Sequence, residues 1–171
     1  MIVKTNGYLE AYYESCKSGK NVIGYELMME LERLMEDMQS DQYIYNTTEA
    51  DIRIDFIQNC IKLTKSPFYG LPMKLMDFQL ALISALYGFK MLDGTMRFKR
   101  LLLLIARKNG KSEFCSALVL TEMIIGGKGL DIVCSSNDDT QASILTDAVD
   151  TMRGMIDPES EDTWRNQKGI R

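Results

Sequence analysis

The sequence contains no histidine, and its four cysteines lie far apart without a Cys-x-x-Cys pair. Zinc sites are built from closely spaced Cys and His ligands, so we expect no zinc centre. The longest apolar run, residues 101–106, is far shorter than the roughly 20 residues of a membrane-spanning helix. The first twenty residues also lack the apolar segment of a secretory signal. Scattered cysteines without such a signal are typical of buried thiols in a reducing cytosol, so the sequence predicts a soluble intracellular protein.

The chain also has little excess charge: 20 Lys and Arg stand against 24 Asp and Glu, for a net charge of −4. A strongly basic protein that coats nucleic acid is therefore not expected. The charges are unevenly spread, because residues 90–111 hold seven basic side chains and one acid, whereas residues 26–55 are mainly acidic. This uneven distribution of charge does not exclude a local basic patch on the surface. A length of 171 residues with 46% hydrophobic residues suits one globular domain with a sizeable core.

Residues 1–66 have the pattern of helices without a sheet. A first helical stripe is formed by Ile23, Leu27, Leu31, Leu34, Met35 and Met38. Thr48-x-x-Asp51 resembles a capping box that opens a second helix, which should end before Pro67. Its expected buried residues are Ile52, Phe56 and Ile57, followed by Ile61 or Leu63. We interpret this segment as a packing or oligomer surface.

From Pro67 onward the pattern changes to that of an α/β fold. A loop at residues 66–74 precedes a helix at 76–90, with Phe78, Leu82, Leu86 and Phe89 on one side. The segment 98–106, with its apolar run, is typical of a strand buried on both faces, although its leucines also favour a helix, and a second short strand is expected at 129–136. Helices are expected at about 112–125 and 137–156. Alternation of strands and helices predicts a parallel sheet with right-handed crossovers.

The loop between the first of these strands and its helix reads Arg-Lys-Asn-Gly-Lys-Ser, residues 107–112. A glycine-bearing loop that opens a helix directs backbone N–H groups and the helix dipole at an anion. In a phosphate loop, Lys111 reaches the β- and γ-phosphates, the Ser112 hydroxyl binds Mg²⁺, and Gly110 permits close approach of the backbone. Ile105 occupies the place of the usual first glycine. Arg107 could instead neutralise charge at the γ-phosphate, whereas Lys108 is interpreted as facing solvent or a partner.

The string "IARKNGKS" resembles the variant Walker A loop of bacteriophage terminase large subunits, the motors that pump DNA into procapsids. "LMDFQLALISALYGFK" is similar to the family's adenine-recognising segment, with Phe78 and Gln79 as the aromatic–glutamine pair. From the residue alone, Gln79 would be a polar side chain on an exposed helix face. "GLDIVCSSNDDTQASIL" resembles the second strand and the following turn, with Gln141-Ala142 opening the next helix. The resemblance extends over roughly residues 67–156.

This resemblance implies a P-loop ATPase fold that uses ATP and Mg²⁺, with a helical N-terminal segment at residues 1–66 and the front part of the ATPase domain at 67–171. It implies that Arg107 is catalytic and that Ser112 binds the metal. The implied nucleotide-binding residues are Phe78, Gln79, Arg107, Lys108, Asn109, Gly110, Lys111 and Ser112. The implied partners are double-stranded viral DNA, the portal protein and the small terminase subunit, without a membrane. The expected location is the host bacterial cytoplasm, at the procapsid portal, and homo-oligomerisation is left open.

Two family features are not found in the sequence. The acidic Asp-Glu motif expected after Gln141 does not occur, "MIDPES" being the closest string, and the nuclease domain is absent. The sequence thus resembles the front of a terminase, as a truncated reading frame, a split subunit or a cut piece. Without those acids we expect weak nucleotide binding, negligible hydrolysis and exposed apolar sheet edges. The alternatives are a helicase-like P-loop ATPase fragment and a non-catalytic interaction module with a relic loop.

Overall fold

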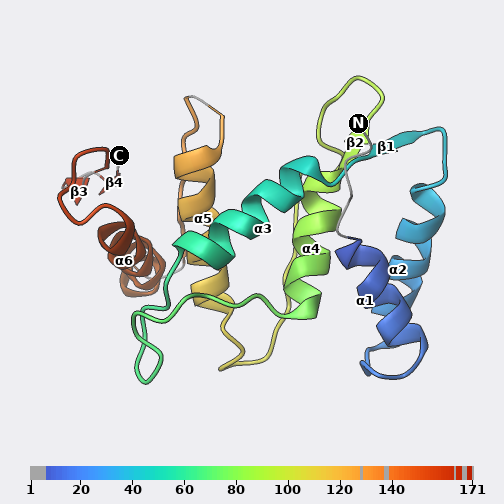
Figure 1. Ribbon diagram of the computed structural model, residues 1–171, viewed down its shortest axis with the longest axis horizontal. Helices are drawn as coiled ribbons and strands as arrows, with labels where there is room; N and C mark the ends of the chain where they lie inside the picture. The colour runs from blue at the N-terminus through green and yellow to red at the C-terminus, as the bar shows by residue number, and fades with distance from the viewer. Residues whose placement is uncertain (1–6, 128, 137–138, 164, 167–168, 171) are drawn as a thin grey trace. The chain divides into compact units, whose positions relative to one another are not determined.

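A computed structural model describes residues 7–127, 129–136, 139–163, 165–166 and 169–170 of the chain. The chain is mainly helical, with two small antiparallel strand pairs (Figure 1). Its elements are α1 (Tyr8–Lys17), α2 (Tyr25–Asp37), β1 (Tyr43–Tyr45), α3 (Thr48–Cys60), α4 (Asp77–Gly88), β2 (Phe89–Met91), α5 (Lys111–Ile125), α6 (Asp139–Ile156), β3 (Arg165–Asn166) and β4 (Gly169–Ile170). In the described part of the chain, no helix is long and apolar enough to cross a membrane.

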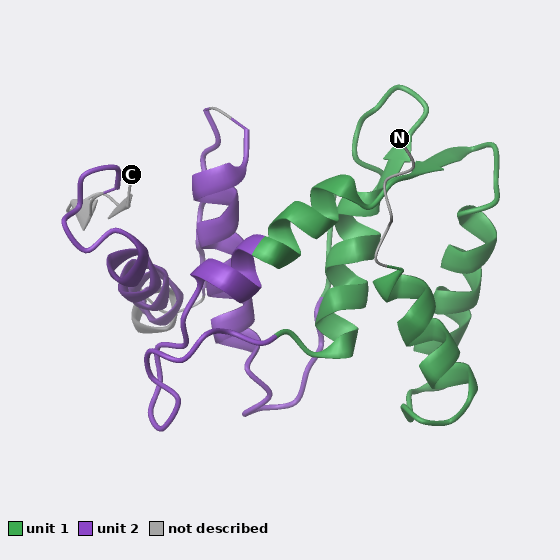
Figure 2. Cartoon of the chain, in the orientation of Figure 1, with its two compact units in different colours: residues 1–55, 75–102 green, residues 56–74, 103–171 purple. Residues whose placement is uncertain are grey.

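The elements form two compact units (Figure 2). Unit 1 consists of residues 1–55 and 75–102, and unit 2 consists of residues 56–74 and 103–171. Each unit is therefore assembled from two stretches of chain. The functional boundary expected near residue 66 stays a prediction, because compactness alone does not locate function.

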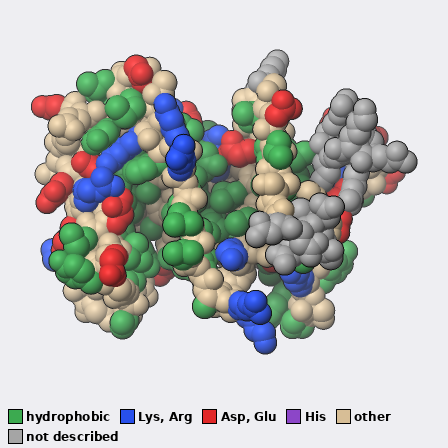
Figure 3. Space-filling view, turned by 180° about the vertical axis from the view of Figure 1, so that it is seen from behind, with side chains coloured by type: hydrophobic (Ala, Val, Ile, Leu, Met, Phe, Trp, Pro, Cys, Tyr) green, Lys and Arg blue, Asp and Glu red, His purple; other side chains and the backbone are tan. Residues whose placement is uncertain are grey.

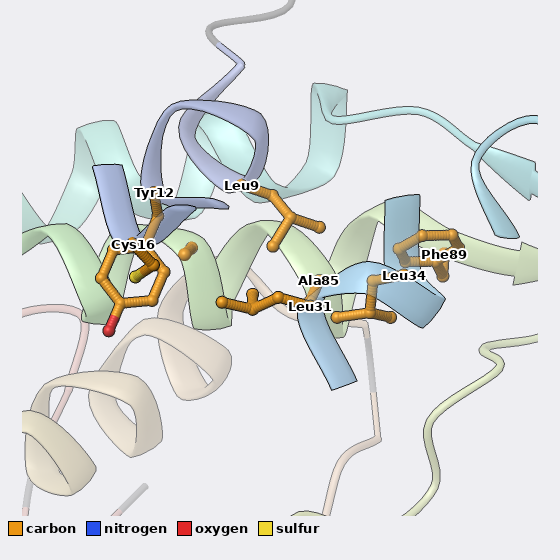
Figure 4. Packing of buried hydrophobic residues seen from close by; sticks show 8 residues of the cluster. Leu9, Tyr12, Cys16, Leu31, Leu34, Ala85 and Phe89 are labelled. Atoms are coloured by element: carbon orange, nitrogen blue, oxygen red, sulfur yellow. The ribbon is translucent and has the colours of Figure 1, made fainter. Parts of the chain in front are cut away.

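Unit 1 is built around a hydrophobic core between α1, α2 and α4 (Figure 4). Leu31 and Leu34 of α2 are buried there, as the sequence predicted, whereas Leu27 is exposed. The antiparallel pair β1–β2 closes the unit, with Tyr45 opposite Phe89 and their ring centroids 4.6 Å apart. Burial of these large side chains is what stabilises the three helices against one another.

The start of α3 differs by one residue from the predicted cap. The hydroxyl of Thr47, rather than that of Thr48, donates a hydrogen bond to the Asp51 carboxylate (2.9 Å). In return, the Asp51 N–H donates a hydrogen bond to the Thr47 carbonyl (2.7 Å). The buried stripe of α3 consists of Ala50, Ile54 and Ile57 and continues to Ile61 beyond the helix end, whereas Ile52 is exposed. The prediction that Ile52 is buried was wrong, because the neighbouring isoleucines at the three- and four-residue spacing form the apolar face instead.

Two of the seven basic side chains at residues 90–111 are used inside unit 1. Lys90 forms an ion pair with Glu49, and Arg97 forms one with Asp37. The Arg97 guanidinium also lies 3.8 Å from the ring centroid of Tyr43. Two of the basic side chains in this stretch are thus held in ion pairs, which reduces the positive charge available for the local basic patch that the sequence does not exclude.

Unit 2 is centred on the packing of α5 against α6. Phe114, Ala117 and Leu120 of α5 are fully buried, as are Val149 and Met152 of α6. The Ser116 hydroxyl donates a hydrogen bond to the carbonyl of Leu145 (3.3 Å), which fixes the two helices at one level. Both helices were predicted from the sequence with nearly these bounds.

The predicted parallel sheet is not found in the described residues. Residues 101–106 and 130–136 have no strand conformation, and the strand pairs that do form are antiparallel. The apolar side chains of the two segments are uncovered: Leu102, Leu104 and Val133 are 82%, 84% and 85% exposed. An extended apolar segment becomes a central strand only when neighbours on both edges take its backbone hydrogen bonds. The apolar runs were identified correctly from the sequence, but the sequence does not show whether neighbouring strands are present to pair with them.

Candidate functional site

The loop at residues 107–110 leads directly into α5 and contains two residues with left-handed backbone conformation. Gly110 has φ +71°, and Lys108 has φ +69°. Glycine adopts this conformation freely, whereas a residue with a Cβ is strained by roughly 1–2 kcal/mol. A Cβ added at Gly110 would meet no atom within 4 Å. Backbone conformation, and not lack of space, is therefore what requires glycine at this position.

The N-terminus of α5 is open. Its first helical hydrogen bond runs from the Phe114 N–H to the Gly110 carbonyl (2.9 Å), and no side chain of the described residues caps the helix. The N–H groups of the residues between them, 111–113, consequently have no acceptor within the helix. Free N–H groups at the positive end of a helix dipole attract an anion such as phosphate.

Basic side chains surround this open helix start. Arg107, Lys108 and Lys111 are all exposed, and none of them forms an ion pair with another described residue. Asn109 is exposed as well, and Ser112 is half-buried in the first turn of α5. The structure thus brings together six of the predicted site residues, 107–112, at the start of one helix, with their cationic groups available to a ligand.

Glu113 is a residue of this site that the sequence analysis missed. It is buried in the first turn of α5, and its carboxylate accepts hydrogen bonds from the Thr64 N–H (3.1 Å) and the Thr64 hydroxyl. This contact fastens the start of α5 to the loop that follows α3, within unit 2. The sequence showed an acid in the first turn of this helix. Its partner lies 49 residues away in the chain, however, and no local sequence pattern indicated that the two residues are in contact.

Phe78 and Gln79 belong to unit 1, where they form part of the first turn of α4. Gln79 is only 2% exposed, and its Oε1 accepts a hydrogen bond from the Met76 N–H (2.9 Å). The interpretation of Gln79 as a side chain on an exposed helix face was therefore wrong, because the amide caps its own helix. Phe78 packs partly buried against the core of unit 1. The role of both residues in adenine recognition stays a prediction.

The two remaining sequence signals lie at the ends of α6. Gln141 and Ala142 are in its first turns, and their side chains lie outside the described part of the structure. Asp157 of "MIDPES" follows the last turn, and its carboxylate accepts hydrogen bonds from the Thr163 hydroxyl (2.8 Å) and from the N–H groups of residues 161–163. The Thr163 hydrogen bond is the main cause that lowers the pKa of Asp157. Asp157 thus organises a turn, and among the described residues no three Asp, Glu or Cys side chains gather into a metal site.

A Gly-Lys-Ser sequence thus opens an uncapped helix, an arrangement whose backbone N–H groups and dipole suit an anion. A family model described as the terminase large subunit, ATPase domain, matches residues 77–161, which include α4, β2, α5 and α6. This part of the chain is therefore a terminase large subunit region, and the resemblance seen in the sequence is confirmed. Comparisons with curated proteins and with solved structures gave no match.

Proposed function

We propose that this chain supplies the nucleotide-binding part of an ATP-driven motor that packages viral DNA into procapsids. The match to a terminase ATPase domain supports ATP use. The single observation on which the proposed site depends is the helix start at Lys111, which follows the left-handed Gly110. No side chain of the described residues caps this helix start, and its basic side chains form no ion pair with a described residue. Such a helix start offers three N–H groups and a lysine to a phosphate at no cost in broken contacts.

In this proposal each residue of the loop makes a different contact with ATP or Mg²⁺. Lys111 contacts the β- and γ-phosphates, the Ser112 hydroxyl binds Mg²⁺, and the backbone at Gly110 approaches the phosphates closely. Arg107 neutralises charge that develops at the γ-phosphate during cleavage, which makes it the catalytic residue of the loop. Lys108 and Asn109 line the same loop.

Recognition of the adenine base is assigned to Phe78 and Gln79. The Gln79 Oε1 atom is bonded to the backbone of its own helix, so its amide NH₂ group is the part that would donate to a ring nitrogen of adenine. An aromatic ring next to it suits stacking against the base. Substituting Gln79 should therefore affect the stability of α4 as well as nucleotide affinity.

A further part of the proposal concerns the sheet and the partners. Residues 98–106 and 129–136 would pair as parallel strands in the assembled ATPase domain, which would cover apolar side chains such as Leu104 and Val133 that are exposed here.

The motor would act on double-stranded viral DNA with the portal protein and the small terminase subunit, in the bacterial cytoplasm at the procapsid portal. These partners follow from the family alone.

Isothermal titration calorimetry with ATP and Mg²⁺ tests the proposal. We expect the unaltered chain to bind and Lys111→Ala to weaken binding by about tenfold or more, since a charge-assisted contact to phosphate is lost. Lys20→Ala is the matched control, because Lys20 is an exposed lysine of unit 1. Circular dichroism establishes that each variant is folded. Equal affinity in Lys111→Ala and the unaltered chain, or no binding by either, would contradict the proposal and favour the interaction-module alternative.

A further inference from the structure

A second exposed feature of unit 2 is the loop between α3 and α4, residues 61–74, which we name the lysine–aromatic loop. Its two arms are joined by backbone hydrogen bonds from Leu63 N–H to the Leu71 carbonyl, from Gly70 N–H to the Leu63 carbonyl and from Met73 N–H to the Ile61 carbonyl, each 2.9 Å long. Gly70 has φ +79°, which lets the chain reverse at the tip. The loop is therefore an ordered hairpin-like projection.

Two aromatic rings stand uncovered at the tip of this loop. Phe68 is 57% exposed and its neighbour Tyr69 is 61% exposed. The tip is itself held in shape, because the Phe68 N–H donates to the Lys65 carbonyl (2.9 Å) and the Leu71 N–H donates to the Phe68 carbonyl (3.0 Å). Rings on a backbone that is already ordered lose little conformational freedom when they bind a partner.

The charge of the loop has one sign. Lys62, Lys65 and Lys74 are exposed, and no Asp or Glu occurs between Asp55 and Asp77. None of the three lysines forms an ion pair with another described residue. Glu113, the acid bonded to the loop at Thr64, is buried and already accepts two hydrogen bonds there. The loop therefore carries three lysines that form no ion pair with a described residue and two exposed rings at its tip.

We propose that the lysine–aromatic loop binds DNA in which bases are unpaired. The three lysines would neutralise phosphates, and the rings of Phe68 and Tyr69 would stack on bases, a combination that recurs where proteins hold single strands. Stacking requires open base faces, so a paired duplex offers the rings no equivalent surface. A protein partner without an acidic surface could cover the rings but gives no reason for three lysines without a single acid.

The loop is also fastened to the first turn of α5 through the Thr64–Glu113 contact, within one compact unit. Its charge, exposure and hydrogen bonds nevertheless all come from its own residues, 61–74. The DNA contact accordingly does not rest on the proposed ATPase function, and the two ideas fail or succeed separately. Lys111→Ala should leave DNA binding by the lysine–aromatic loop unchanged.

Fluorescence anisotropy with a labelled single strand about 20 nucleotides long, measured without ATP, tests the inference. We expect the double variant Phe68→Ala/Tyr69→Ala to lose at least about tenfold in affinity, because two stacking contacts disappear. The variant Lys62→Gln/Lys65→Gln/Lys74→Gln should reduce the slope of log affinity against log salt by about 2. Tyr25→Ala and Lys20→Gln are the matched controls, since both residues are exposed but lie in unit 1.

Thermal melts followed by circular dichroism identify the variants that are folded, so a loss of binding can be assigned to the surface. The same experiment with a blunt duplex separates the kinds of DNA, and we expect it to bind more weakly and without dependence on the two rings. Single-strand affinity that is unchanged in the folded ring variant would overturn the proposal. Equal losses in Tyr25→Ala or Lys20→Gln would overturn it too, because binding would then be a general property of the surface.

Discussion

At the scale of single residues, the candidate site depends on a few side chains and backbone angles at the start of α5. Gly110 has a left-handed backbone, and the exposed cations around it form no ion pairs in the described structure. The sequence predicted the residues of this loop because Gly-Lys-Ser between an apolar run and a helix is a local pattern. It missed the contact of Glu113 with Thr64 because that contact joins residues distant in the chain.

Gly110→Ala should lower the free energy of unfolding by about 1 kcal/mol, because alanine is strained at φ +71°. No steric clash adds to this, since the new methyl group would meet nothing within 4 Å. Gly127→Ala is the matched control, because its Cβ also meets nothing within 4 Å and its φ lies outside the left-handed range. Urea denaturation measures both variants. A cost at Gly110 no larger than at Gly127 would mean that the left-handed turn is absent in solution.

The hydrogen bonds between Glu113 and Thr64 should give a measurable coupling energy between the two residues. Glu113→Ala leaves the Thr64 N–H and hydroxyl without their acceptor in a partly buried place, so we expect a loss of about 1–3 kcal/mol. Thr64→Ala in the Glu113→Ala background should cost much less than in the unaltered chain. Urea denaturation of the two single variants and the double variant gives the coupling energy. Strictly additive effects would show that the two residues do not interact.

At the scale of elements, helices were predicted well and strands were not. The helical segments α2, α4, α5 and α6 each carry their own three- and four-residue apolar spacing, which is visible along the chain. A strand becomes ordered through a neighbour, and the sequence offered no sign that β1 would pair with β2 across more than forty residues. The segments 98–106 and 129–136 were predicted to be strands from their apolar residues, and the described structure shows no partner strand for them.

The turn that ends α6 should respond to acid through Asp157. Its pKa lies below the ordinary value of 3.8, mainly because of the Thr163 hydroxyl, so the folded state holds the ionised form more firmly than the unfolded state does. The resulting stability is present above pH 3.8 and is lost as the pH falls through the lowered pKa.

Asp157→Asn should therefore have a lower urea midpoint than the unaltered chain at pH 7, and the difference should shrink at pH 3. Asp131→Asn is a suitable control, because Asp131 is exposed and makes none of the hydrogen bonds that hold Asp157. Urea denaturation at the two pH values measures the effect. A difference that is the same at pH 7 and pH 3 would exclude the ionised carboxylate as its cause.

At the scale of the whole molecule, the described surface combines charged side chains with uncovered apolar ones (Figure 3). Leu104 and Val133 are among the most exposed apolar residues, and both belong to unit 2. Apolar residues that are exposed in this way promote association of chains. The sequence led us to expect the apolar edges of an incomplete sheet. That sheet is not found in the described residues, so the expectation stays a prediction, and the exposed apolar side chains belong to segments without strand conformation.

Replacing these two residues should improve behaviour in solution without weakening the fold. We expect Leu104→Lys/Val133→Lys to change the free energy of unfolding by less than about 0.5 kcal/mol, because both side chains are mostly exposed and bury little area. Sedimentation velocity should show less self-association than in the unaltered chain. Ile124→Lys provides a control on an exposed position of α5. Strong destabilisation by the double variant would mean that these residues are covered in solution.

The most direct test of the account is NMR of the backbone amides at the start of α5 during titration with Mg²⁺ and ATP. The account predicts saturable shifts of the amides at Lys111, Ser112 and Glu113, because their N–H groups are the ones left open to a phosphate. The same shifts should be absent in Lys111→Ala at matched nucleotide concentration. Saturable shifts elsewhere in the chain with none at these three amides, or no shifts at all, would contradict the assignment of this helix start as the nucleotide site.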